Sequence, residues 1–148
     1  MHEEAKNLIL QRIKILVREI ISCRPITEEQ LIEGFNFSQR QKTHPEECIC
    51  YREAKPCHDL NGKLNCTFCY CPGYDLKREQ GGCKFGNPEG KGKEIDFPNN
   101  GIRRIWDCSN CTFPHQKQNT INFLQKVGIQ NKTFEELEES FKELFGVA

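Results

Sequence analysis

The sequence has no long apolar run and no excess of charge of either sign. Its apolar runs near the N-terminus, residues 8–10 and 15–17, contain only three residues each. An export signal needs about 7–15 apolar residues and a transmembrane helix about 20. The 21 Lys and Arg residues equal the 21 Asp and Glu residues, whereas binding to nucleic acid or to a membrane surface needs excess positive charge. We therefore expect a cytoplasmic protein that binds neither a membrane nor nucleic acid.

Sequence patterns of the common enzyme classes are also missing. There is no carboxylate pair in an acid–base pattern, no nucleophile elbow of the hydrolases and no Walker loop. The glycine-rich stretch 81–93 lacks the Gly-Lys-Ser/Thr ending of a phosphate-binding loop. We predict no catalytic and no organic-cofactor-binding residues, and we favour a function other than catalysis.

Cysteine, by contrast, is abundant, with ten residues in a chain of 148. Nine of them lie between residues 44 and 118, together with eight of the eleven glycines. Leu, Ile, Val and Phe account for 11 of these 75 residues, about 15%, which is too little for an ordinary hydrophobic core. Metal–thiolate bonds can order such a segment, because free energy of metal binding becomes free energy of folding. In a reducing cytosol they are also more common than a disulfide framework.

The segments on either side of this region have helical periodicity. Residues 3–22 carry apolar side chains on one face and charges on the other. Thr27 and Thr133 each begin a capping-box pattern. We predict that these helices pack on each other and cover one side of the cysteine-rich region; a docking surface for a partner is the alternative. The expected fold is a small, metal-stabilised, loop-rich domain with short strands and flanking α-helices. Its predicted parts are an N-terminal helical segment, a cysteine-rich metal-binding domain and a C-terminal helical segment, at residues 1–43, 44–118 and 119–148.

Two Cys-x2-Cys pairs are the clearest signal for metal binding. Cys66 with Cys69, and Cys108 with Cys111, have the two-residue gap that lets one turn present two sulfurs to one ion. Two such pairs complete a tetrahedral site, so we predict that these four residues bind one ion. A second ion is expected to be bound by Cys50, Cys57, Cys71 and Cys83. The alternative is that His58 or His115 replaces one of these cysteines.

Zinc is the favoured metal, and an iron–sulfur cluster is the alternative. Nine cysteines and three histidines give twelve candidate ligands, and tetrahedral zinc uses four, so we expect about two ions. The run 66–72 ends in Cys-Pro, as bacterial cluster-binding runs do, but its spacing differs from Cys-x2-Cys-x2-Cys-x3-Cys-Pro. Cys23 and Cys48 lie outside the two pairs and are predicted to be peripheral thiols.

These observations predict a cytoplasmic zinc-binding protein whose ions are structural and whose surface binds an unidentified protein partner. Sites filled by protein ligands leave no position for a substrate. One alternative is an iron–sulfur redox or accessory protein. A second is an RNA-binding zinc knuckle, because Arg103, Arg104 and Trp106 precede Cys108 as in Trp-x-Cys-x2-Cys fingers. The second Cys-x2-Cys pair that such fingers have downstream is absent.

The cysteine-rich region also resembles a known family. The runs 65–72 and 107–115, together with Cys57-His58 and Gly82-Cys83, are similar to the cysteine-rich small domain family, which is zinc-finger-like. Members occur alone or appended to larger proteins, some of which resemble α-ribazole phosphatases, so the resemblance also suggests a link with cobalamin metabolism. The resemblance spans roughly residues 48–117 and implies metal binding at Cys57, Cys66, Cys69, Cys71, Cys83, Cys108, Cys111 and His115.

Overall fold

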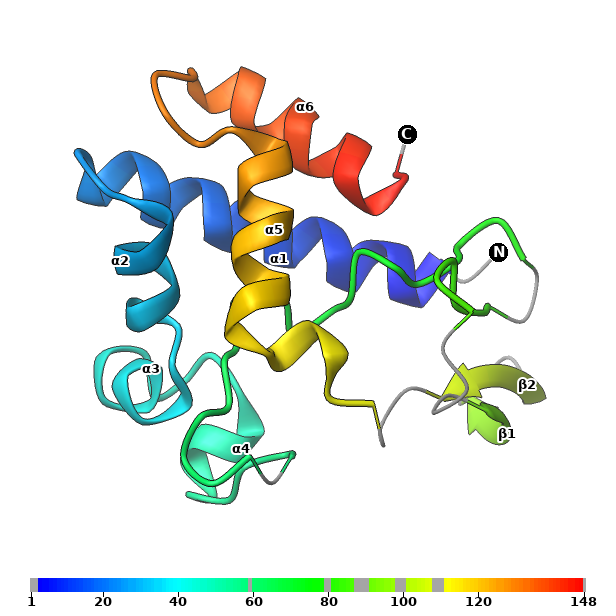
Figure 1. Cartoon of the computed structure of the whole chain (residues 1–148). Helices are drawn as coiled ribbons and strands as arrows, with labels where there is room; N and C mark the ends of the chain where they lie inside the picture. The colour runs from blue at the N-terminus through cyan, green and yellow to red at the C-terminus, as the bar shows by residue number, and fades with distance from the viewer. Residues whose placement is uncertain are drawn as a thin grey trace.

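The computed structural model of this chain is mostly helical, with one small β-sheet. It describes residues 3–58, 60–78, 81–86, 91–97, 101–107 and 111–147. Within these residues it contains six α-helices, a short 3-10 helix and two strands (Figure 1). In chain order they are α1 (Glu3–Cys23), α2 (Glu28–Gly34), α3 (Phe37–Thr43), α4 (Ile49–Arg52), β1 (Lys91–Phe97), β2 (Gly101–Asp107), η1 (Phe113–His115), α5 (Lys117–Val127) and α6 (Phe134–Phe145).

The longest of these helices, α1, is amphipathic. Ile13, Leu16 and Ile20 on one face are at most 1% exposed, whereas Lys14 and Arg18 are exposed. Burial of apolar surface, worth roughly 25 cal/mol per Å², therefore stabilises this helix against the rest of the protein. In the described part of the chain, no helix combines the length and the apolar composition that a membrane crossing requires.

Both capping boxes predicted from the sequence are confirmed. Thr27 accepts a hydrogen bond from the backbone N–H of Gln30, and its own N–H donates to the Gln30 side chain. Thr133 and Glu136 form the same reciprocal pair at the start of α6. Each box satisfies donors that a helix start otherwise leaves unpaired. Gly146 ends α6 in the left-handed conformation, which glycine adopts without strain.

The N- and C-terminal helices pack on each other and on the cysteine-rich region. Helix α1 contacts α6, and α5 contacts both α2 and α6 (Figure 1). Phe68 and Leu76, from the cysteine-rich region, join this core. The packing predicted from helical periodicity is therefore confirmed. The core residues contributed by the helices and their flanks are Ile9, Ile13, Leu16, Val17, Ile20, Leu31, Ile32, Phe35, Phe123, Leu124, Val127, Ile129, Leu137, Phe141, Phe145 and Val147.

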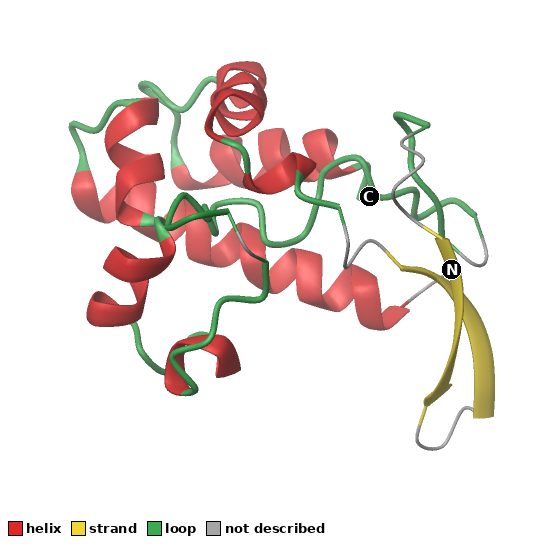
Figure 2. Cartoon of the chain, turned by 60° about the horizontal axis from the view of Figure 1, so that its bottom comes forward, coloured by secondary structure: helices red, strands yellow, loops and turns green. Residues whose placement is uncertain are grey.

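The sequence patterns do not locate helices α3 and α4 or the hairpin of β1 and β2. Helices α3 and α4 have seven and four residues, too few to show a helical period. Strands β1 and β2 form an antiparallel hairpin that projects away from the helices (Figure 2), with Lys91 opposite Asp107 and Phe97 opposite Gly101. Short strands are expected in this region, but their position is not predicted. Two runs containing apolar residues on either side of an Asn100-Gly101 pair are the signal that could locate them.

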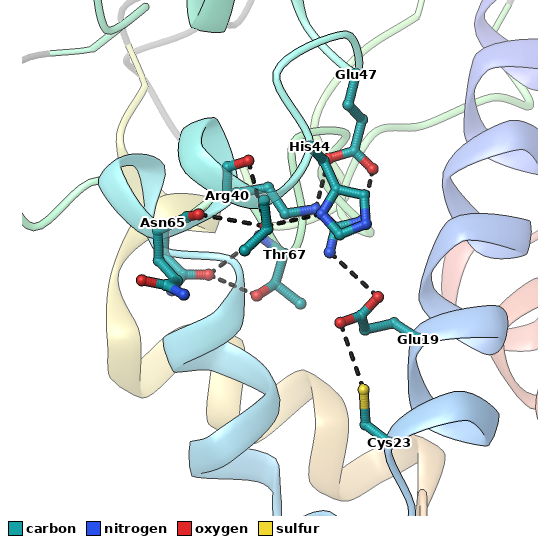
Figure 3. A network of polar contacts seen from close by, with 9 residues as sticks. Glu19, Cys23, Arg40, His44, Glu47, Asn65 and Thr67 are labelled. Atoms are coloured by element: carbon teal, nitrogen blue, oxygen red, sulfur yellow. Dashed lines mark hydrogen bonds and ion pairs between the residues drawn. The ribbon is translucent and has the colours of Figure 1, made fainter.

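Arg40 links α1 to the segment that leads into the cysteines. Its side chain, in α3, is buried, and its Nε and Nη2 each donate a 2.7 Å hydrogen bond to the Glu47 carboxylate. Its Nη1 lies 3.2 Å from a carboxylate oxygen of Glu19 in α1 (Figure 3). Although burial alone would raise it, these hydrogen bonds and the charge of Arg40 hold the pKa of Glu47 below its ordinary value. The network fixes the position of Glu47, the residue that precedes Cys48 in the chain.

Candidate metal centre

Five cysteines from neighbouring parts of the fold lie close together. Cys48 is the N-cap residue of α4, Cys50 lies within α4, and the two thiols are hydrogen-bonded to each other. Cys57 follows α4, and Cys66 and Cys69 form the first Cys-x2-Cys pair. Cys57 and Cys66 each interact electrostatically with Cys69, and Cys69 does so with Cys48. We call these five residues the cysteine cluster.

The turn that carries the first Cys-x2-Cys pair is held against the α2–α3 junction. The backbone N–H of Cys66 donates a 2.8 Å hydrogen bond to the Phe35 carbonyl. The buried side chain of Asn65 donates to the Ile32 carbonyl at 2.8 Å and accepts a hydrogen bond from the Thr67 N–H at 3.0 Å (Figure 3). These bonds satisfy buried polar groups on both sides. These hydrogen bonds hold the turn of Cys66 and Cys69 in place without a metal ion.

A small apolar cluster surrounds the sulfurs. Phe37, Tyr51, Leu64 and Cys66 are its buried members, and Cys48, Cys50 and Leu60 pack against it. The Tyr51 ring stands edge-on to Phe37 at a centroid distance of 5.1 Å, and its side chain is hydrogen-bonded to Cys66. The sulfurs thus lie in surroundings that favour their neutral form.

Burial raises the pKa values of several thiols in the cluster. It is the largest cause of the shift of Cys66 to about 12, which the Tyr51 hydrogen bond partly offsets and the nearby Cys69 increases. Burial, followed by the neighbouring Cys69, raises the pKa of Cys57 to about 11. Burial is also the largest cause of the raised pKa values of Cys50 and Cys69. An ion that binds here would displace protons, because the thiolate is the metal ligand.

We expect the metal-free protein to lose stability as the pH rises above about 9. The Cys66 thiol titrates at about 12 in the folded protein, against an ordinary value of 9.0. Between these values the folded state holds a proton that the unfolded chain releases. The contribution of Cys66 is therefore complete below pH 9 and is lost as the pH rises towards 12. Urea unfolding with chelator and reductant at several alkaline pH values measures this.

A Cys66→Ala variant provides the control for this titration. It removes the titrating thiol, so its free energy of unfolding should fall less steeply over the same alkaline range. Tyr51, whose pKa is raised chiefly by burial, contributes with the same sign in both proteins. A wild-type stability that rises between pH 9 and 11 would contradict the prediction.

His58 and His115 lie side by side next to the cluster. Their ring centroids are 4.4 Å apart, and Nδ1 of His58 lies 3.2 Å from the Cys57 sulfur. His115 is buried, and its Nδ1 lies 2.8 Å from the Asn65 carbonyl. Because a carbonyl only accepts, this nitrogen carries the proton and Nε2 is available to a metal. Burial lowers the pKa of His115 and so favours the neutral form that a metal requires.

Three other predicted ligands lie among the described residues, and a fourth does not. Cys71 accepts a 3.3 Å hydrogen bond from the Gly73 N–H, and Cys83 forms a backbone bridge with Tyr74. Cys111 is buried. Cys108 lies outside the described residues, so the pairing of the two Cys-x2-Cys motifs around one ion stays a prediction. The proposed composition of the second site also stays a prediction.

The two cysteines that the sequence sets aside differ in their surroundings. Cys23 is exposed at the end of α1, where its sulfur lies 3.6 Å from Glu19. Cys48 instead belongs to the cysteine cluster. Its spacing from Cys50, Cys-x-Cys, is the sequence signal that could identify it, because alternate residues can bring two sulfurs to one side of a short turn.

The donor atoms near the cluster, sulfur and imidazole nitrogen, are of the types that bind zinc. Among the described residues, no three His, Cys, Asp or Glu side chains are already arranged to hold one ion, so coordination would require side chains of the cluster to draw closer. Five sulfurs beside two imidazoles are nonetheless the donors that zinc prefers. The buried Nε2 of His58 has no hydrogen-bond partner in the described part of the structure, and a bound metal would provide one.

A match to a known family covers the cysteine cluster and both histidines. Residues 39–139, about two thirds of the chain, match the zf-like model "Cysteine-rich small domain". The chain belongs to the cysteine-rich small domain family. The match of the cysteine-rich small domain includes every cysteine except Cys23, as well as His58 and His115, whereas α1 and α2 precede it. No curated protein and no solved structure shows significant similarity to the chain.

Proposed function

We propose that this protein is a zinc-binding module in which the ion has a structural role. The observation that carries the proposal is the cysteine cluster itself, five thiols gathered from residues 48–69. The cysteine-rich region has few apolar residues with which to hold such a group together. A bound zinc ion would cross-link these segments and add its binding free energy to folding.

The kind of donors favours zinc over an iron–sulfur cluster. Cluster irons are bound mainly by cysteine thiolates, whereas structural zinc accepts mixed sulfur and imidazole ligands. The neutral, buried His115 next to His58 fits the second chemistry. With the ion enclosed by protein ligands, we propose that the surface it stabilises serves a protein partner.

We expect protein purified without oxygen to contain about two zinc ions per chain and to be colourless. Elemental analysis for zinc, iron and sulfide, combined with a visible absorption spectrum, makes the measurement. A brown sample with iron and sulfide would replace zinc by an iron–sulfur cluster. Protein that retains no metal, and that takes up neither zinc nor iron under reducing conditions, would contradict the proposal.

A further inference from the structure

Arg12 of α1 is a buried cation without a matching carboxylate. Arg12 is only 6% exposed. Its Nε and Nη1 atoms are buried and have no hydrogen-bond partner in the described structure. No carboxylate of the described residues forms an ion pair with it. Arginine stays protonated inside proteins, and a buried charge without a partner is strongly unfavourable. This position therefore requires a negative charge that protonated thiols do not provide.

The cysteine cluster is the group that Arg12 faces. Its guanidinium interacts with the Cys69 side chain, and its charge also acts on Cys66. The carboxylate of Glu47 interacts with the charge of Arg12, but both of its oxygens accept hydrogen bonds from Arg40. The remaining titratable neighbours of Arg12, Tyr51 and Tyr70, are phenols, which are neutral at pH 7. Among the described residues, negative charge for Arg12 can therefore come only from sulfur.

A second buried arginine, Arg40, has the carboxylate partners that Arg12 lacks in the described part of the chain. Arg40 and Arg12 both lie over the ring of Phe35, at 4.2 and 6.0 Å from its centroid. Arg40 is paired with Glu47 and Glu19 (Figure 3). The same physical requirement applies to both side chains, and for Arg12 the described residues leave only the thiolates.

We propose that Arg12 is the counter-ion of an anionic metal–thiolate centre in the cysteine cluster. The inference rests on the proposed metal-binding function and specifies the charge of that centre. A divalent ion with four thiolates carries a net charge of −2, with three thiolates and a histidine −1, and with two of each zero. Only the first two require a cation. Arg12 thus indicates at least three sulfur ligands, and it makes α1, which precedes the family match, part of the metal environment.

The test compares Arg12→Met with Arg18→Met, an exposed arginine on the same helix. Competition with a chromophoric chelator measures Zn²⁺ affinity, and urea unfolding measures the stability of the metal-free proteins. We expect Arg12→Met to weaken Zn²⁺ binding about 10- to 100-fold, as loss of groups behind metal ligands does. Its metal-free form should be as stable as the wild type or more stable, since an unpaired buried charge is removed. Arg18→Met should change neither quantity.

Three results would overturn the inference. Unchanged Zn²⁺ affinity in Arg12→Met, with lower stability of the metal-free form, would make Arg12 a packing residue only. X-ray absorption of the zinc-loaded wild type, which needs no variant to fold, should count three or four sulfur ligands per ion; two or fewer would exclude an anionic centre. A wild type that binds no metal would overturn the proposed function as well, whereas the first two results leave that function intact.

Discussion

Replacing Cys66 by serine is expected to remove one bound metal ion per chain and to destabilise the region around it. Cys66 is buried, is hydrogen-bonded to Tyr51, and interacts with Cys57 and Cys69. A structural zinc ion contributes on the order of 10 kcal/mol to the folding of small domains, and serine is a poor ligand in place of a thiolate. Metal analysis and proton NMR of the purified variant measure both effects.

The control for this prediction is Cys23→Ser. Cys23 is also a free thiol, but it is exposed and belongs to α1 rather than to the cluster. This variant should keep the wild-type metal content and NMR spectrum. If Cys66→Ser gives a dispersed, native spectrum and binds the full amount of metal, then the cysteine cluster does not order this region.

Replacing Phe68 by alanine is expected to lower the free energy of unfolding by about 3–5 kcal/mol. Phe68 lies between the two cysteines of the first pair and has no exposed surface. Its ring centroid lies 5.3, 6.0 and 6.5 Å from those of Phe123, Phe145 and Phe141 in α5 and α6. Alanine would leave a cavity where the cysteine-rich region meets these helices. Urea unfolding of the metal-loaded proteins provides the measurement.

Phe134→Ala is the matched control for Phe68. Its side chain at the start of α6 is 38% exposed, so its loss should change the free energy of unfolding by no more than about 1 kcal/mol. Equal effects of the two substitutions would show that Phe68 does not anchor the cysteine pair to the helices. A smaller loss in Phe68→Leu, which fills part of the cavity, would support the packing explanation.

Local patterns are sufficient to predict the flanking helices and the family. The periodicity of residues 3–22 and the capping boxes at Thr27 and Thr133 locate α1, α2 and α6, because the forces that start and stop a helix act within one or two turns. The Cys-x2-Cys spacing and the residues around it indicate the cysteine-rich small domain, which the family match confirms. The hairpin is missed because strand pairing depends on partners distant in the chain.

Which side chains meet at the candidate centre depends on long-range packing. Cys48 joins the cluster because Arg40 ties residue 47 to α1. His115 meets a carbonyl 50 residues away. Arg12 shows the same dependence: a spacing of 57 residues from Cys69 carries no signal until α1 packs against the core. A charged residue on an amphipathic helix is expected to face solvent, so its burial against sulfur is visible only in the folded protein.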